Sequence, residues 1–190
     1  MAPTFETIEP HINEIREYIF GDLERITNLE LGVNYMAAGI MMCACDLFGY
    51  LRYGRQYYGA KFVTDYMGQI NSSYSKIGKS LYKSLRHGIV HTYETEKVQI
   101  GNKTIDFCIS WRQREHFSVD RSKLQINLNI PKMLEELRAA FETYVAELRI
   151  NGERRDQFLK SRQKILEGTN LKNKKEQQSL LNFFEPDAAS

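Results

Sequence analysis

The chain has 190 residues, of which 42% are hydrophobic and 26% are charged. This composition is typical of one globular domain with a sizeable core, and it excludes a disordered or fibrous chain. The net charge of +2 excludes a strongly basic overall field, so binding to nucleic acid would depend on a local cluster of cations.

Apolar residues recur at helical spacing through the first part of the chain and predict two long helices. The first covers about residues 8–28, with an apolar position at every third or fourth residue. The second covers about residues 32–55 and is apolar over most of its surface, so we expect it to be the central helix. Asp46 is the one acid in this apolar span. It either lies partly exposed at the edge of the core or pairs with a cation of a later helix, for which Arg86 is a candidate.

A turn rich in tyrosine follows the central helix. Tyr50, Tyr53, Tyr57 and Tyr58 surround two glycines there, and their rings suit either the lining of a groove or ordinary loop packing. A short helix is expected over about residues 60–67. The sequence Asn71-Ser72-Ser73 then supplies a capping signal for a strongly amphipathic helix that begins near Ser72 and ends near Tyr93.

After Tyr93 the apolar pattern changes to a period of two, which predicts strands. Residues 97–100 and 104–111 flank a Gly-Asn turn and form the expected hairpin, and residues 123–129 form a third strand after a polar loop at 112–116. Pro131 suits the first turn of a long last helix that runs to about Leu148, with a further helical stretch over 155–166.

These elements predict a mainly α protein, a helical bundle with a small antiparallel β-hairpin or sheet inserted before a long C-terminal helix. We assign residues 1–166 to the domain, with the β element at about 96–130, and residues 167–190 to a mobile polar tail. His11 and His116 lie in polar contexts and are expected at the surface.

Cysteine usage and apolar runs indicate the cellular setting. Cys43, Cys45 and Cys108 lack the paired spacing of a zinc site or a disulfide framework, which predicts reduced thiols in a cytoplasmic protein. The apolar run over residues 36–45 is too short to cross a bilayer, and residues 1–6 lack the pattern of a signal peptide, so we expect no membrane partner.

One face of the amphipathic helix carries cations and no carboxylate among its polar residues. This cationic face comprises Lys76, Lys79, Lys83, Arg86, His87 and His91. On a straight α-helix, residues five apart diverge by about 140°, so Arg86 and His91 would lie on either side of Val90. The face suits phosphate chemistry at a subunit contact, but a solvated helix face and a structural Arg/His pair are open alternatives. His87 and His91 have the spacing of metal ligands, but the face has no acid or cysteine to complete a site, so we predict no metal and no other cofactor.

The string Arg86-His87-Gly88-Ile89-Val90-His91-Thr92-Tyr93 resembles the Arg-x4-6-His signature of the HEPN superfamily of helical ribonucleases. The resemblance covers roughly residues 8–93, and the long last helix is compatible with it. It implies a HEPN-like helical bundle that cleaves RNA without a metal, through the neighbouring 2′-OH, at a cleft shared by two protomers. Tyr93, two residues after the histidine, further resembles HEPN toxins paired with a nucleotidyltransferase-like antitoxin, in which that tyrosine is modified.

The implied reaction assigns roles to the residues of the cationic face. Histidine exchanges protons near neutral pH, so His91 is the expected general acid or base. Arg86 remains charged and matches two phosphate oxygens, so it would stabilise the transition state. His87, Tyr93 and Asp46 would support them, and the lysines at 76, 79 and 83 would hold flanking phosphates. A homodimer would bring the diverging Arg86 and His91 together at a composite site.

The tail contains a second motif. Gln177, Leu180, Phe183 and Phe184 fit the pattern Gln-x-x-(Leu/Ile/Met)-x-x-aromatic-aromatic, which is similar to the peptide that docks into sliding clamps of the PCNA type. A terminal helical turn that folds back onto its own domain is the other interpretation. The resemblance to HEPN proteins thus implies an endoribonuclease of defence or toxin–antitoxin biology. The alternative is a non-catalytic HEPN-like module that binds nucleic acid or protein, with its tail as a means of recruitment to a clamp.

Overall fold

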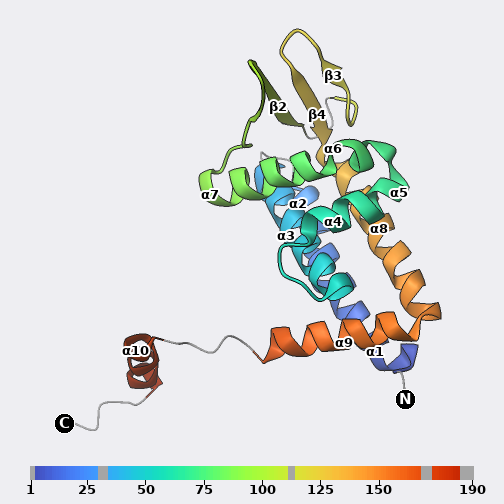
Figure 1. The fold of residues 1–190 in the computed structure, drawn as a ribbon, viewed down its shortest axis with the longest axis vertical. Coiled ribbons are helices and arrows are strands. Elements are labelled where there is room, and N and C mark those ends of the chain that lie inside the picture. The colour runs from blue at the N-terminus through green and yellow to red at the C-terminus, as the bar shows by residue number, and fades with distance from the viewer. Residues whose placement is uncertain (1–2, 30–33, 111–113, 168–172, 185–190) are drawn as a thin grey trace.

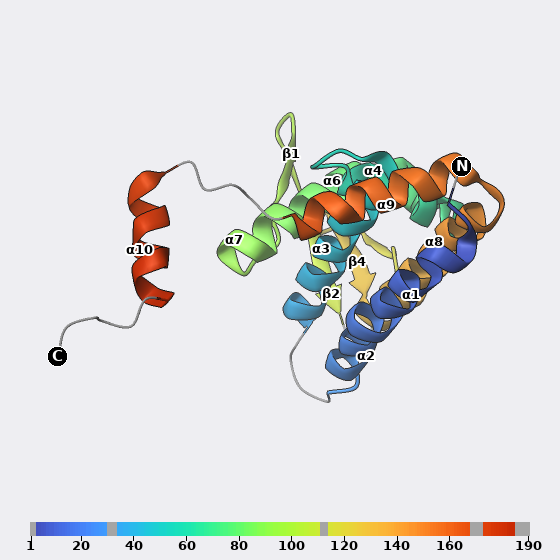
Figure 2. The same ribbon diagram turned by 90° about the horizontal axis from the view of Figure 1, so that it is seen from below.

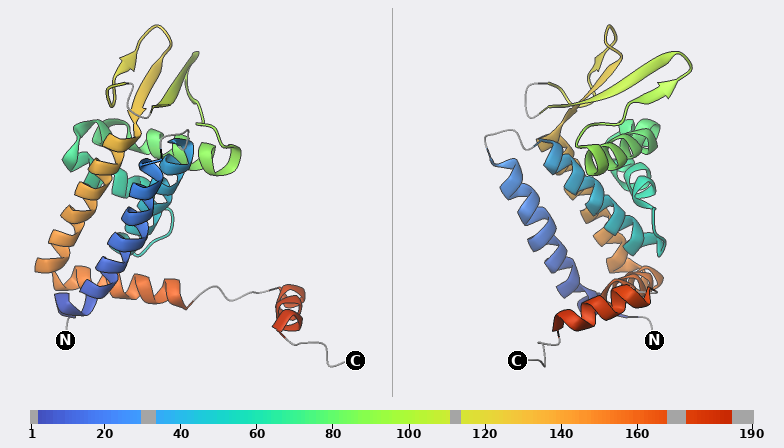
Figure 3. Two further views of the ribbon diagram at one scale, coloured as in Figure 1. Left: turned by 180° about the vertical axis from the view of Figure 1, so that it is seen from behind. Right: turned by 90° about the vertical axis from the view of Figure 1, so that its left-hand side faces the viewer.

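The computed structural model describes residues 3–29, 34–110, 114–167 and 173–184. Three long helical segments lie side by side, and the chain adds one helical layer at each end of them (Figures 1 and 3). The first segment is α1 (Phe5–Ile15), the π-helical segment η1 (Arg16–Phe20) and α2 (Gly21–Thr27), and the other two are α3 (Asn34–Tyr53) and α8 (Ile130–Ile150). This confirms the two long N-terminal helices and the central position of α3, whose expected start at Gly32 lies outside the described residues.

The middle of the chain forms shorter helices. They are α4 (Gly59–Phe62), the π-helical segment η2 (Val63–Met67), α5 (Gly68–Ile70), α6 (Ser72–Lys83), the π-helical segment η3 (Ser84–Ile89) and α7 (Val90–Thr92). The Asn71 side chain accepts a hydrogen bond from the backbone N–H of Ser73 at 3.1 Å, which confirms the predicted cap of α6. Tyr74, Leu81 and Leu85, on the apolar stripe of α6 and η3, are fully buried.

A small sheet stands at one end of the bundle, above α6 (Figure 1). It contains β1 (Val98–Ile100), β2 (Lys103–Ser110), β3 (Val119–Asp120) and β4 (Gln125–Asn129) in the order β1-β2-β4-β3. β1 and β2 form the predicted antiparallel hairpin, with Ile100 opposite Lys103. The expected end of the second strand at Trp111 lies outside the described residues.

The sheet is mixed, whereas the sequence predicted antiparallel pairing throughout. β4 pairs with β2 in parallel, and the two-residue strand β3 pairs antiparallel with β4 at the edge. After β2 the chain first forms β3 at the edge of the sheet. It then turns back and forms β4 between β2 and β3. The β3–β4 hairpin adds one reversal of direction, so the third predicted strand, β4, runs parallel to β2. The sequence did not predict β3, because a strand as short as Val119–Asp120 has no detectable period of two.

The last part of the domain confirms the mainly α fold with a small sheet inserted before a long C-terminal helix. The Asn129 side chain caps α8 by accepting a hydrogen bond from Lys132 N at 3.0 Å, and the helix breaks at Asn151. α9 (Gly152–Leu166) then crosses the opposite end of the bundle from the sheet (Figure 3). None of the described helices has the length and apolar character needed to cross a membrane.

The tail forms a further helix, α10 (Lys174–Phe184), that stands apart from the bundle (Figures 1 and 2). Leu180 and Leu181 are about half exposed on it. The backbone of the clamp-like peptide is therefore helical and is not folded back onto the domain. The side chains of Phe183 and Phe184 lie outside the described residues, and the mobility of the tail stays a prediction.

Candidate active site

The Arg-x4-His motif lies where the helix widens into a π-helical turn. Arg86, His87 and Gly88 lie within η3, and His91 follows in α7. The carbonyl of Ser84, at the start of η3, accepts a hydrogen bond from the backbone N–H of Glu96 at 3.0 Å. The N–H of Glu96 thus competes with the N–H groups of the helix for this carbonyl. Competition of this kind perturbs α-helical geometry.

This turn corrects the predicted divergence of Arg86 and His91. A π-helix has more residues per turn than an α-helix, so the π-helical part of this span, from Arg86 to Ile89, brings Arg86 and His91 closer in direction than a straight α-helix would. The 140° separation held only for a straight α-helix. Arg86, His87 and His91 instead line one groove of about 640 Å³ in a single protomer. The geometric reason for pairing the two residues across a dimer therefore does not apply.

The rest of the groove lining is mostly aromatic and apolar. It comes from α3, the loop after it, α6 and the end of α9, and consists of Asp46, Leu47, Tyr50, Gln56, Tyr57, Tyr82 and Ile165. Of these, Asp46 has the ion pair with Arg86 that was one of its two predicted alternatives, and it is also partly exposed, which was the other. The tyrosine-rich turn was one candidate for a groove lining. Leu47, Gln56, Tyr82 and Ile165 were not predicted to line a site. The spacing of four residues between Tyr82 and Arg86 was the available signal for Tyr82.

Asp46 holds the guanidinium of Arg86. Nε of Arg86 donates to Oδ2 of Asp46 at 2.8 Å, and the hydroxyl of Tyr82 donates to Oδ1 of the same carboxylate. Both members of the ion pair keep somewhat more than a quarter of their side-chain area exposed. The hydrogen bond to Asp46, opposed by burial, raises the pKa of Arg86. Burial, followed by the bond to Asp46, raises the pKa of Tyr82 well above its usual range, so Tyr82 remains a donor.

The two histidines are exposed at the groove and contact each other. Their ring centroids are 6.2 Å apart at an interplanar angle of 75°. Among the described residues neither histidine ring makes a hydrogen bond or ion pair, so the His87 ring does not orient Arg86 and Asp46 takes that role. His91 is open to a bound molecule, as a residue that transfers protons must be.

The lysines of the cationic face are all exposed, but they differ in their surroundings. Lys79 borders a second, smaller hollow next to the groove. Lys83 lies 3.9 Å from a carboxylate oxygen of Glu96, and Lys76 lines neither hollow. The face is therefore not free of acids, because Asp46 and Glu96 reach it from neighbouring parts of the chain.

An exposed apolar surface adjoins the end of the motif. Val90 is 45% exposed and Tyr93 is 64% exposed. The Tyr93 ring stacks on Tyr35 of α3 with a centroid distance of 6.5 Å, and its backbone is left-handed with φ of 62°. Tyr93 does not line the groove.

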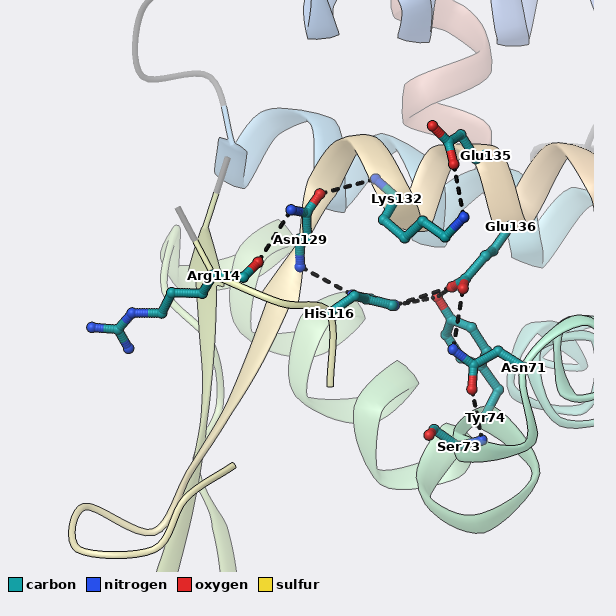
Figure 4. Close-up of polar contacts among 9 residues, drawn as sticks. All are labelled: Asn71, Ser73, Tyr74, Arg114, His116, Asn129, Lys132, Glu135 and Glu136. Carbon is teal, nitrogen blue, oxygen red and sulfur yellow. Dashed lines mark hydrogen bonds and ion pairs between the residues drawn. The ribbon is translucent and has the colours of Figure 1, made fainter. Parts of the chain in front are cut away.

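A second polar cluster joins the sheet to the bundle (Figure 4). His116 was expected at the surface, but its side chain is only 6% exposed. Its Nδ1 accepts the backbone N–H of Asn129 at 3.0 Å, and its Nε2 lies 3.1 Å from Oε2 of Glu136. The same carboxylate accepts bonds from the Tyr74 hydroxyl at 2.9 Å and from Asn71 Nδ2 at 3.1 Å. Because this cluster is buried and fully bonded, we assign it to the architecture and not to the reaction.

No group of three or more His, Cys, Asp or Glu side chains within the described ranges could hold a metal ion. Comparison of the chain with protein-family models, with curated proteins and with solved structures gives no match to any of them. The resemblance to the HEPN superfamily therefore stays a prediction that rests on the motif and its helical setting.

Proposed function

We propose that the protein is a metal-independent endoribonuclease of HEPN type, acting in the cytoplasm in defence or as the toxin of a toxin–antitoxin pair. One observation carries the proposal: a single groove brings together Arg86, which is held by a carboxylate, and His91, which is exposed and unbonded within the described chain. Cleavage through the neighbouring 2′-OH needs proton transfer and stabilisation of charge on phosphorus. His91 supplies the first and Arg86 the second.

The geometry favours a particular division of labour. Nε of Arg86 is bonded to Asp46, and within the described chain its two terminal nitrogens make no hydrogen bond, so they can match two phosphate oxygens. His91, on the next turn, exchanges a proton with the 2′-OH or the leaving oxygen. Lys79, beside the groove, adds a contact to a neighbouring phosphate.

Cleavage of RNA in the presence of EDTA tests the proposal. The parent should cleave single-stranded RNA to products with a 2′,3′-cyclic phosphate, and Arg86→Ala and His91→Ala should each lose at least about 100-fold in rate. Matched controls are Arg25→Ala and His11→Ala, which remove the same residue types from helices away from the motif and should cleave at the rate of the parent. Equal rates for the parent and the two motif variants, or cleavage that requires an added metal ion, would refute it.

The alternative is a non-catalytic binding module that uses the groove for nucleic acid and the tail for a sliding clamp. The observation that favours it is α10, which carries Leu180 exposed on a helix that stands apart from the bundle. The same assay separates the two functions, because a binding module would leave the RNA uncleaved.

A further inference from the structure

Tyr57 projects into solvent from the loop between α3 and α4. The residue is 89% exposed, and its backbone has a φ of 64°, a conformation that is strained for a bulky residue. The neighbouring Tyr58 packs on Tyr53 with a centroid distance of 5.5 Å and accepts a hydrogen bond from Arg55. In the described part of the chain, the Tyr57 ring makes no such contact. The loop thus tolerates backbone strain while leaving an aromatic ring uncovered.

The loop is pressed tightly against the bundle, so the backbone that carries the ring is held in a defined place. A Cβ added at Gly49 of α3 would lie 2.4 Å from the carbonyl oxygen of Tyr58, and one added at Gly59 would lie 2.6 Å from both Oδ1 of Asp46 and the ring of Tyr82. Only glycine fits at these two close approaches. The loop that presents Tyr57 therefore rests on the same carboxylate that holds Arg86.

Tyr57 lines two hollows that contain cations. The first is the groove with Arg86, His87 and His91. The second, of about 280 Å³, is lined by Lys61, Thr64 and Lys79 as well as by Tyr57 and Tyr58. Lys61 is paired with Asp65 at 2.7 Å, while Lys79 is exposed and makes no ion pair with any described residue. An uncovered aromatic ring that borders two hollows, each with a cation, matches the alternation of bases and phosphates along a single strand.

We propose that Tyr57 is a base-stacking residue that makes the groove selective for single-stranded RNA. This inference rests on the proposed function for the identity of the ligand. An unpaired base stacks on the Tyr57 ring, while the phosphates on its two sides contact Arg86 in one hollow and Lys79 in the other. A duplex keeps its bases stacked inside the helix, so it cannot place one on Tyr57 without unpairing it.

Binding of a fluorescein-labelled 2′-O-methyl oligouridylate tests the inference, since the blocked 2′-oxygen prevents cleavage. The parent should bind the single strand more tightly than its duplex with 2′-O-methyl oligoadenylate. Tyr57→Gly should weaken binding of the single strand about 5- to 100-fold without affecting the duplex. Glycine removes the ring and also relieves the strain at positive φ, so the variant should be at least as stable as the parent. Tyr57→Phe keeps the ring and should bind as the parent does.

Removing single bases from the oligouridylate adds a direct test of the contact. An abasic position at the stacking site should weaken binding to the parent and have no further effect on Tyr57→Gly, because each change removes the same interaction. Binding by Tyr57→Gly that equals the parent's, while Arg86→Ala binds more weakly, would overturn the stacking role and leave the proposed function standing. If the parent binds neither form of RNA, both proposals fail.

Discussion

Arg86 is the residue in which structure and proposed chemistry meet most directly. The Asp46 carboxylate has both oxygens engaged, one by Nε of Arg86 and one by the Tyr82 hydroxyl, so it cannot rotate away from the guanidinium. Asp46 also lowers the net positive charge of the groove. It therefore acts as a positioning residue, which holds Arg86 in the orientation that reaction requires and weakens the attraction of the site for phosphate.

This dual role predicts opposite effects on turnover and on binding. Asp46→Asn retains the shape of the side chain but removes its charge, so the guanidinium is held less firmly while the groove gains one unit of positive charge. We expect kcat for RNA cleavage to fall about tenfold, which corresponds to about 1.4 kcal/mol of transition-state stabilisation, and the Kd for uncleavable RNA to stay the same or decrease. Asp22→Asn, a change of the same type in α2, is the control and should alter neither. A parallel loss of kcat and of RNA affinity in Asp46→Asn would assign Asp46 a structural role instead.

At the scale of elements, the cluster around Glu136 joins α6, α8 and the loop before β3 (Figure 4). Because Nδ1 of His116 accepts a backbone N–H, the ring hydrogen must lie on Nε2, where it faces the Glu136 carboxylate. Burial alone would raise the pKa of Glu136, but the hydrogen bonds from His116, Asn71 and Tyr74 outweigh burial and lower it. The carboxylate thus stabilises the junction between sheet and bundle in its charged form.

The lowered pKa fixes the direction of a pH dependence. The stabilisation from Glu136 is fully present above its ordinary pKa of 4.5 and is lost as the pH falls through the lower folded-state pKa. We expect the free energy of unfolding, measured by urea titration, to decline below about pH 4.5, and Glu136→Gln to decline less steeply after losing about 2 kcal/mol at neutral pH. Glu135→Gln, which changes the adjacent exposed acid, should retain the full decline. Identical acid dependence in the parent and in Glu136→Gln would contradict this assignment.

Elements with a local signal were predictable from the sequence, and contacts set by distant segments were not. The helices α1 to α3 and α8 follow from apolar spacing, and the first hairpin follows from its turn residues. The π-helical turn was not predictable, because it accompanies a hydrogen bond that the Ser84 carbonyl accepts from the N–H of Glu96, a residue beyond the motif. The burial of His116 likewise depends on Glu136, which lies twenty residues further along the chain.

At the scale of the whole molecule, the sheet and α9 occupy opposite ends of the bundle (Figure 1). The groove is lined by the motif segment, by α3 and the loop after it, and by the end of α9. The exposed surface around Val90 and Tyr93 is separate from the groove lining. A homodimer through this surface remains our proposal for the assembly. In such a dimer, each protomer already presents its own Arg86 and His91 together, so a partner is not needed to complete the pair.

Mixing two inactive variants tests whether the active unit is one protomer. Arg86→Ala and His91→Ala each remove one member of the pair from every groove, so a mixed sample should cleave RNA no faster than either variant alone. Co-purification of differently tagged copies after joint refolding would show that the subunits have exchanged. If each site instead took Arg86 from one protomer and His91 from the other, half of the molecules would be mixed dimers with one intact site of two, and roughly a quarter of the parent's activity would return. Recovery to that level would establish the composite site and show that the groove of one chain is not sufficient.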